Sequence, residues 1–159
     1  MNATLGIFNW RILETNISSS GQPTEEQFVE LHNIGVKAII NLAPEDHKDA
    51  LACERELLFS LGTSYTNIPV PFDKPSEETF NSFVHALQSA QAERVHIHCI
   101  FNARVTAYWY RYICEFKQQV KEEARTAMES IWRPGREWAR FIGNEKRVDQ
   151  DHEYAGRDY

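Results

Sequence analysis

Short apolar runs alternate along the chain with longer segments in which apolar residues recur at helical spacing. The run VKAIINLA is almost continuously apolar, which is typical of a strand buried on both faces of a parallel sheet. Similar short runs predict further strands over residues 6–13, 63–70 and 94–99. The pattern therefore indicates a sheet whose strands are separated by helices.

The clearest helix signal lies in the segment TEEQFVELHNIG. Thr24 and Gln27 have the spacing of a capping box, and Gly35 has the position of a helix stop. Phe28 and Leu31 fall on one face of this helix, so we expect them to point into the core.

Three later segments also have helical periodicity. The helix predicted within residues 74–91 carries an apolar stripe of Phe80, Phe83, Val84 and Leu87. The helix predicted after residue 103 carries an aromatic stripe of Tyr108, Trp109, Tyr112, Ile113 and Phe116, which we interpret as core. Further helices are expected over residues 121–132 and around Trp138.

Alternation of strands and helices predicts an α/β fold with a central, mostly parallel sheet flanked by helices. Residues 1–142 are expected to form one domain, a length sufficient for a real core. Residues 143–159 are charged and poor in aliphatic side chains, so we expect a C-terminal tail.

Charge and cysteine usage exclude several classes of function. A net charge of -6 and a pI of about 5.5 argue against nucleic acid or an anionic membrane as a partner. Three cysteines without a CxxC spacing are neither a disulfide framework nor a zinc ribbon. No apolar run is long enough to span a membrane, and the N-terminus lacks a signal core, so a cytoplasmic location is expected. The oligomeric state is left open.

The main chemical candidate is Cys99, which ends the strand RVHIHC directly before a predicted helix. Ligands of α/β proteins bind beyond the carboxyl ends of the strands. The N–H groups at a helix start gather around anions, and Arg104 adds a planar cation at the end of the same loop. These features favour the thiolate, the nucleophilic form of cysteine. The alternative is a small buried cysteine with a structural role.

The segment HCIFNAR after VHI resembles the signature of the protein tyrosine and dual-specificity phosphatase superfamily. The segment ISSSGQPTEEQF and the strand VKAIINLAPE are similar to the opening of atypical dual-specificity phosphatases and of the bacterial DUF442 phosphatase-like family. The resemblance covers about residues 17–117. It implies a dual-specificity phosphatase-like fold and hydrolysis of phosphate monoesters through a cysteine thiophosphate. The implied partner is a phosphorylated or other small anionic substrate, with no metal and no cofactor.

The spacing departs from that signature, because Arg104 comes one position earlier than the superfamily's Arg. In a gapless comparison Val105 takes the Arg position, Thr106 matches the Ser or Thr that follows it, and Asn102 replaces a loop Gly. Asn tolerates the left-handed backbone well, so this replacement is mild. The segment CIFNAR also has the length of the active loop of rhodanese-like sulfurtransferases, which would use a Cys99 persulfide. A non-catalytic anion or phospho-ligand binding module is the third possibility.

If the protein is a cysteine-dependent phosphatase, Cys99 is the nucleophile and Arg104 holds the oxyanion. The expected contacts to the substrate are Ile100, Phe101, Asn102, Ala103 and Thr106.

The general acid is expected to be Asp73, which follows a strand and precedes a helix. Glu45 and Asp46, after the strand VKAIINLA, are the alternatives. The resemblance implies a supporting role for His98, and Gln22 is either a pocket residue or a turn residue. His96 and His98 share one face of a strand, but without a third ligand no metal is expected.

Overall fold

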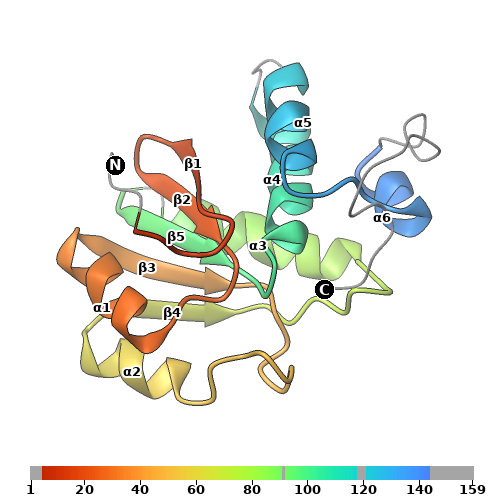
Figure 1. The fold of residues 1–159 in the computed structure, drawn as a ribbon. Coiled ribbons are helices and arrows are strands. Elements are labelled where there is room, and N and C mark those ends of the chain that lie inside the picture. The colour runs from red at the N-terminus through yellow and green to blue at the C-terminus, as the bar shows by residue number, and fades with distance from the viewer. Residues whose placement is uncertain (1–4, 91, 118–120, 144–159) are drawn as a thin grey trace.

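The structure is a computed structural model that describes residues 5–90, 92–117 and 121–143. Five strands form one sheet in the order β1-β2-β5-β3-β4 (Figure 1). The strands are β1 (Arg11–Glu14), β2 (Ile17–Ser20), β3 (Val36–Asn41), β4 (Ser64–Asn67) and β5 (Arg94–His98). Only β1 pairs in the antiparallel sense, so the prediction of a mostly parallel sheet is confirmed.

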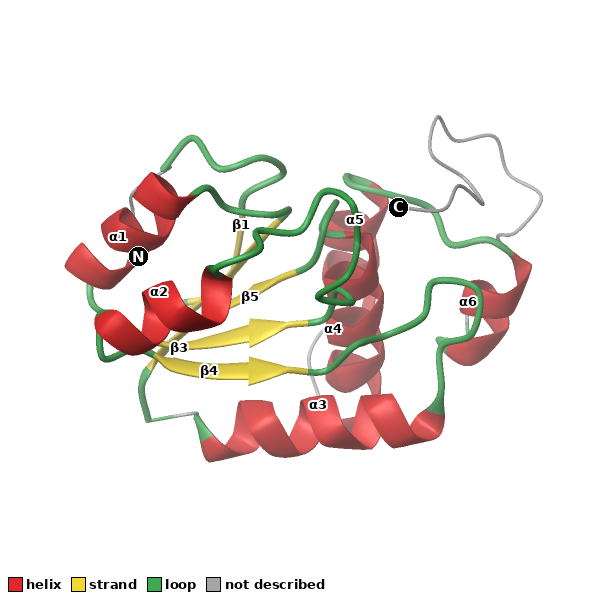
Figure 2. Ribbon diagram, turned by 90° about the horizontal axis from the view of Figure 1, so that it is seen from below, coloured by secondary structure: helices red, strands yellow, loops and turns green. Residues whose placement is uncertain are grey.

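Helices cover both faces of this sheet (Figure 2). They are α1 (Glu25–Asn33), α2 (Glu54–Ser60), α3 (Glu77–Ser89), α4 (Ala103–Phe116), α5 (Lys121–Glu129) and α6 (Arg136–Phe141). Helices α1 and α2 lie on one face, and α3 and α4 lie on the other, where α5 and α6 add a further layer. Because each crossover between parallel strands carries a helix, the carboxyl ends of β2, β3, β4 and β5 meet at one edge.

The first helix begins and ends as its sequence predicts. The Thr24 hydroxyl accepts a hydrogen bond from the Gln27 backbone N–H, and the Gln27 side chain accepts one from the Thr24 N–H. Gly35 follows the helix with a φ of 93°, a left-handed value that suits glycine. Phe28 and Leu31 are both completely buried, which fixes α1 on the sheet.

The core is divided by the sheet into two apolar clusters. The cluster under α1 and α2 contains Ile7, Trp10, Phe28, Leu31, Val36, Ile39 and Leu58. The larger cluster lies under α3 and α4 and includes the predicted stripe of Phe80, Phe83, Val84 and Leu87. Tyr108, Trp109, Tyr112 and Ile113 are buried there as expected, whereas Phe116, in the last turn of α4, is 50% exposed. The aromatic stripe is therefore mainly core.

One predicted strand is shorter in the structure. Residues 6–13 were expected to be extended, but β1 begins only at Arg11. Gly6 and Asn9 have φ values of 64° and 53°, so the chain turns twice before the strand. The segment before β1 is thus a loop that packs on the sheet.

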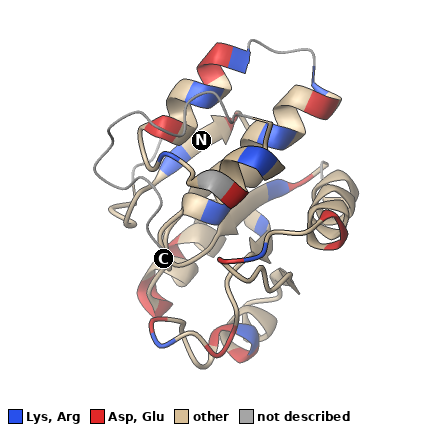
Figure 3. Ribbon diagram, turned by 90° about the vertical axis from the view of Figure 1, so that its right-hand side faces the viewer, with Lys and Arg blue, Asp and Glu red and all other residues tan. Residues whose placement is uncertain are grey.

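Acidic and basic residues are interspersed on the outer helices (Figure 3). Arg111 contacts Glu77 and Glu115, Arg125 contacts Glu122, and Arg140 contacts Glu137. These arginines serve surface ion pairs. In the part of the chain that the structure describes, no helix combines the length and the apolar character needed to cross a bilayer. Of the predicted tail, residues 144–159 lie outside the described residues.

Candidate active site

Cys99 lies at the carboxyl end of the central strand β5. Its N–H donates to the Ser20 carbonyl oxygen of β2 at 3.4 Å, and β3 flanks the strand on the other side. Helix α4 begins four residues later, at Ala103. The predicted placement of Cys99 between a strand end and a helix start is therefore present. Its side chain is fully buried, with 0% exposure.

The loop between Cys99 and α4 turns through a left-handed residue. Asn102 has a φ of 75° and precedes the first turn of α4. The first intrahelical bond runs from the Thr106 N–H to the Asn102 carbonyl oxygen. The N–H groups at the start of a helix have no partner within the helix, and here they adjoin Cys99.

Arg104, in the first turn of α4, is only 3% exposed. Its Nε and Nη1 atoms are buried and have no hydrogen-bond partner among the described residues. The guanidinium carbon lies 5.1 Å from the centre of the Phe72 ring. Because a buried donor without a partner is costly, this guanidinium is suited to an anionic ligand that would satisfy it.

A pocket of about 660 Å³ opens at this guanidinium. Its apolar lining is formed by Phe8, Phe72, Ile100 and Phe101. Its polar lining is formed by Gln22, His47, Lys48, Asp49, Asp73 and Arg104. The structure thus gathers five predicted residues, Gln22, Asp73, Ile100, Phe101 and Arg104, at one concave surface.

The remaining predicted contact residues, Asn102, Ala103 and Thr106, are buried and do not line the pocket. The Asn102 side-chain amide donates to the Asn9 carbonyl oxygen at 2.8 Å and to Ser19 Oγ at 3.1 Å. The Thr106 hydroxyl donates to the Ala103 carbonyl oxygen at 3.1 Å. Cys99 itself is completely buried and is not among the residues that line the pocket.

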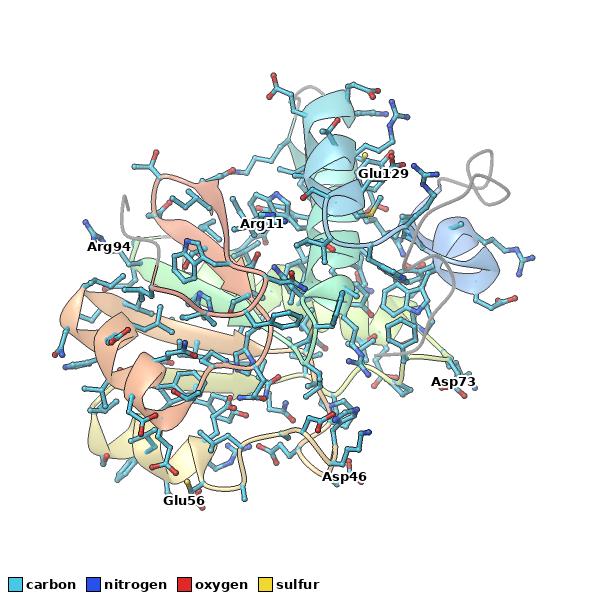
Figure 4. All side chains as sticks on the ribbon, viewed as in Figure 1. Arg11, Asp46, Glu56, Asp73, Arg94 and Glu129 are labelled. Atoms are coloured by element: carbon cyan, nitrogen blue, oxygen red, sulfur yellow. The ribbon has the colours of Figure 1, made fainter. Side chains whose placement is uncertain are left out.

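The three predicted candidates for the general acid differ in whether they line the pocket. Asp73 is exposed and lines the pocket from the loop before α3. Figure 4 shows Asp73 and Asp46 at the strand-end side of the molecule, opposite Arg94 at the start of β5. Glu45 accepts a hydrogen bond from Arg55 at 2.7 Å, and neither Glu45 nor Asp46 lines the pocket.

The loop after β3 contributes other residues that the sequence analysis did not single out. His47, Lys48 and Asp49 line the pocket in place of Glu45 and Asp46. The His47 ring accepts a hydrogen bond from the Asp49 N–H at 3.1 Å. The run of charged residues after the strand indicated a polar loop near the site. It did not show which of its side chains line the pocket.

A buried ionic network supports the strand ends. Glu54, in the first turn of α2, is 4% exposed and lies 2.8 Å from His98 Nε2. Gln22 Nε2 donates to the other Glu54 oxygen at 2.8 Å, and Asn41 Nδ2 donates to Glu54 Oε1 at 3.2 Å. Burial raises the pKa of Glu54, but the charge and hydrogen bonds of its partners outweigh this and leave that pKa below its ordinary value.

This network gives His98 and Gln22 their place in the site. Both side chains contact Glu54, and Glu54 therefore connects the ends of β2, β3 and β5 to α2. The sequence did not reveal Glu54, since an acidic residue in the first turn of a helix is common for electrostatic reasons alone.

His96 has a separate, structural environment. Ser18 Oγ and Ser20 Oγ each lie 2.9 Å from one of its ring nitrogens, and Trp10 stacks on the ring. Burial, and secondarily the charge of His98, holds the pKa of His96 well below its ordinary value, so the ring is neutral. Among the described residues, no group of three or more His, Cys, Asp or Glu side chains is arranged to hold a metal ion.

A larger groove of about 1210 Å³ lies between the β4 edge and α3. Small polar side chains such as Ser64, Thr66, Asn81 and Ser82 line much of it, and no cysteine or arginine does. Among the described residues, the groove therefore lacks a buried guanidinium like that of Arg104, which lines the smaller pocket.

Comparison with known proteins gives the class of the fold. A crystal structure of Pseudomonas aeruginosa TpbA in complex with phosphotyrosine superposes with a TM-score of 0.65 at 18% identity, over 81% of this chain and 76% of that chain. A second similar structure is the core catalytic domain of the PP-IP phosphatase SIW14 from Saccharomyces cerevisiae, in complex with citrate. Its TM-score is 0.69 at 16% identity, and the match covers 90% of this chain and 88% of that chain. The chain has the α/β fold of tyrosine and dual-specificity phosphatases.

A closer likeness identifies the family that the chain resembles. A DUF442 phosphatase-like protein from Shewanella putrefaciens is 27% identical, with a TM-score of 0.78 over 96% of both chains. No protein-family model and no curated protein matches the chain. The structural comparisons support the DUF442 phosphatase-like family, and the resemblance predicted from the sequence is confirmed.

Proposed function

We propose that the protein is a cysteine-dependent hydrolase of phosphate monoesters. The observation that carries this proposal is the buried guanidinium of Arg104, which faces a pocket at the start of α4 and whose Nε and Nη1 have no hydrogen-bond partner in the described part of the chain. A phosphoryl group would supply the missing acceptors and meet the positive end of the helix.

The proposed reaction has two displacement steps. The Cys99 thiolate attacks phosphorus, the ester P–O bond breaks, and Asp73 protonates the leaving oxygen. Water then attacks the thiophosphate, Asp73 takes its proton, and the P–S bond breaks to release phosphate. Arg104 and the loop N–H groups hold the non-bridging oxygens throughout. Because Cys99 is completely buried and does not line the pocket, the phosphoryl group must enter the loop to reach Sγ.

The pocket lining favours one phosphoryl group on an aromatic or apolar body. Phe8, Phe72 and Phe101 offer ring surfaces for such a body. The cations Lys48 and Arg104 are balanced by Asp49 and Asp73, so a ligand with several phosphates finds little additional positive charge.

The proposal is tested with p-nitrophenyl phosphate and the purified full chain between about pH 5 and 8. We expect release of phosphate and nitrophenolate without added metal. The decisive negative result is no turnover across this range. Sulfur transfer from thiosulfate to cyanide would instead indicate the persulfide chemistry, and a phosphate-induced rise in melting temperature with both assays silent would indicate a binding module.

Asp73→Asn should lower kcat/KM, which reports the first displacement, by roughly 100-fold or more for phenyl phosphate, since phenolate is a poor leaving group that needs protonation. The loss should be clearly smaller for p-nitrophenyl phosphate, whose leaving group is stable as an anion. Asp49→Asn is the matched control, because Asp49 lines the same pocket. A leaving-group-dependent loss in Asp49→Asn and not in Asp73→Asn would assign the acid to Asp49.

A further inference from the structure

We propose that Asn9 is a positioning residue that keeps the Cys99–Asn102 loop open toward a phosphoryl group. The inference rests on the proposed function, because it concerns how that loop is held in its anion-binding form. Asn9 does not line the pocket, and its action is through the backbone of the loop.

Asn9 is itself held firmly on the protein. It lies in a turn closed by a hydrogen bond from the Trp10 N–H to the Ile7 carbonyl oxygen at 3.1 Å. Both of those residues are buried, and Trp10 stacks on His96. Asn9 has a φ of 53°, which Asn tolerates better than most residues. The turn therefore presents the Asn9 amide at a fixed position.

Asn9 and the loop exchange two hydrogen bonds. Asn9 Nδ2 donates to the Phe101 carbonyl oxygen at 2.8 Å, and Asn102 Nδ2 donates to the Asn9 carbonyl oxygen at 2.8 Å. Asn9 and Asn102 are the two non-glycine residues with positive φ in the described part of the chain. The Asn that replaces a loop Gly in the sequence thus has a contact that Gly could not make.

The bond from Asn9 Nδ2 to the Phe101 carbonyl oxygen sets the direction of the 101–102 peptide plane. In a planar trans peptide, the carbonyl of one residue and the N–H of the next point in opposite directions. With the Phe101 carbonyl drawn toward Asn9, the Asn102 N–H points away from Asn9. The Gln22 N–H holds the Ile100 carbonyl oxygen at 3.1 Å and orients the Phe101 N–H in the same way.

The neighbouring turn makes this arrangement tight. Gly21 donates its N–H to the Phe8 carbonyl oxygen at 2.8 Å, and a Cβ on Gly21 would lie 2.8 Å from the Ile100 carbonyl oxygen. The segments around Asn9 and Gly21 therefore pack against the side of the loop on which the Ile100 and Phe101 carbonyl oxygens lie. Without the Asn9 amide, the Phe101 carbonyl oxygen loses its hydrogen-bond donor. The 101–102 peptide can then rotate and point this oxygen toward the anion, and the oxygen would repel the anion.

Asn9→Gly removes the amide and keeps the backbone free to adopt positive φ. The probe is inorganic phosphate, titrated into the full chain by calorimetry. We expect the dissociation constant to rise at least about tenfold, a change of 1.4 kcal/mol. The KM for p-nitrophenyl phosphate should rise in parallel. The melting temperature without phosphate should stay near that of Asn16→Ala, a control that also removes a bond from an Asn side-chain amide to a backbone carbonyl oxygen, that of Glu93.

Each outcome separates this inference from the proposed function. If the wild-type protein binds phosphate and Asn9→Gly binds within about twofold, Asn9 has no positioning role while the proposed function stands. A wild-type protein that neither binds phosphate nor hydrolyses the ester overturns both. Should Asn9→Gly unfold, Asn9→Asp replaces the donor by an acceptor of the same shape, and unchanged phosphate affinity in that variant overturns the inference.

Discussion

Cys99→Ser is expected to lower turnover of p-nitrophenyl phosphate by at least about three orders of magnitude. Serine has nearly the size of cysteine, so the completely buried position should accept it with the fold intact. Its hydroxyl, however, is a far weaker nucleophile than a thiolate. The measurement is steady-state hydrolysis, together with phosphate binding by calorimetry, which should persist because Arg104 and the loop N–H groups are unchanged.

The control for this substitution is Cys114→Ser, on the same helix that follows the loop. Cys114 is partly buried in α4 and lies outside the pocket lining, so its replacement should leave turnover within about twofold. Equal activity of the wild-type protein and Cys99→Ser would remove the covalent mechanism. It would leave direct attack by water at the Arg104 pocket as the remaining route.

The strands and helices that carry the site could be predicted from the sequence, because each is indicated by residues that are close together in the chain. A near-continuous apolar run, a capping box and a Cys directly before a helix each depend on residues close in the chain. The fold that they imply then brings Asp73, Phe101 and Arg104 together, since the carboxyl ends of parallel strands share one edge. The left-handed φ of 75° at Asn102 was anticipated from the resemblance instead, because Asn102 stands where the phosphatase signature has a loop Gly.

Contacts between distant segments could not be inferred in this way. Asn9 lies 92 residues from Phe101, and Glu54 lies 44 residues from His98. Nothing in the residues around Asn9 indicates that its amide holds another loop, and two left-handed residues made a strand prediction over 6–13 too long. Similarly, the charged loop after β3 offered several acids, and only tertiary packing selects Asp49 over Glu45 and Asp46 for the pocket.

These distant contacts would keep the proposed anion site open in an acidic protein. The positive groups at the loop are few, so their orientation matters more than their number. Glu54 holds the strand ends from the α1 and α2 side, and Asn9 holds the Phe101 carbonyl oxygen of the loop. Because both act through hydrogen bonds to other residues, their loss should weaken the site without removing a group that contacts the substrate.

Glu54→Ala is expected to lower the free energy of unfolding by about 3 kcal/mol, because three hydrogen bonds to a buried carboxylate are lost at about 1 kcal/mol or more each. The substitution leaves His98 Nε2 buried without its partner, whereas Gln22 Nε2 keeps the Pro23 carbonyl oxygen and Asn41 Nδ2 keeps the Tyr65 hydroxyl. Denaturant titration at pH 7 measures the change. The melting temperature should fall by roughly 10 °C for a chain of this size.

Glu45→Ala provides the comparison, because Glu45 forms an exposed pair with Arg55 at 2.7 Å and its loss should cost less than about 1 kcal/mol. The difference between wild type and Glu54→Ala should also depend on pH. Since the folded-state pKa of Glu54 lies below its ordinary value of 4.5, its stabilisation is present above that value and is lost as the pH falls through the folded pKa. The two proteins should therefore converge in acid. A Glu54→Ala variant no less stable than Glu45→Ala at pH 7 would show that the buried network does not hold the strand ends.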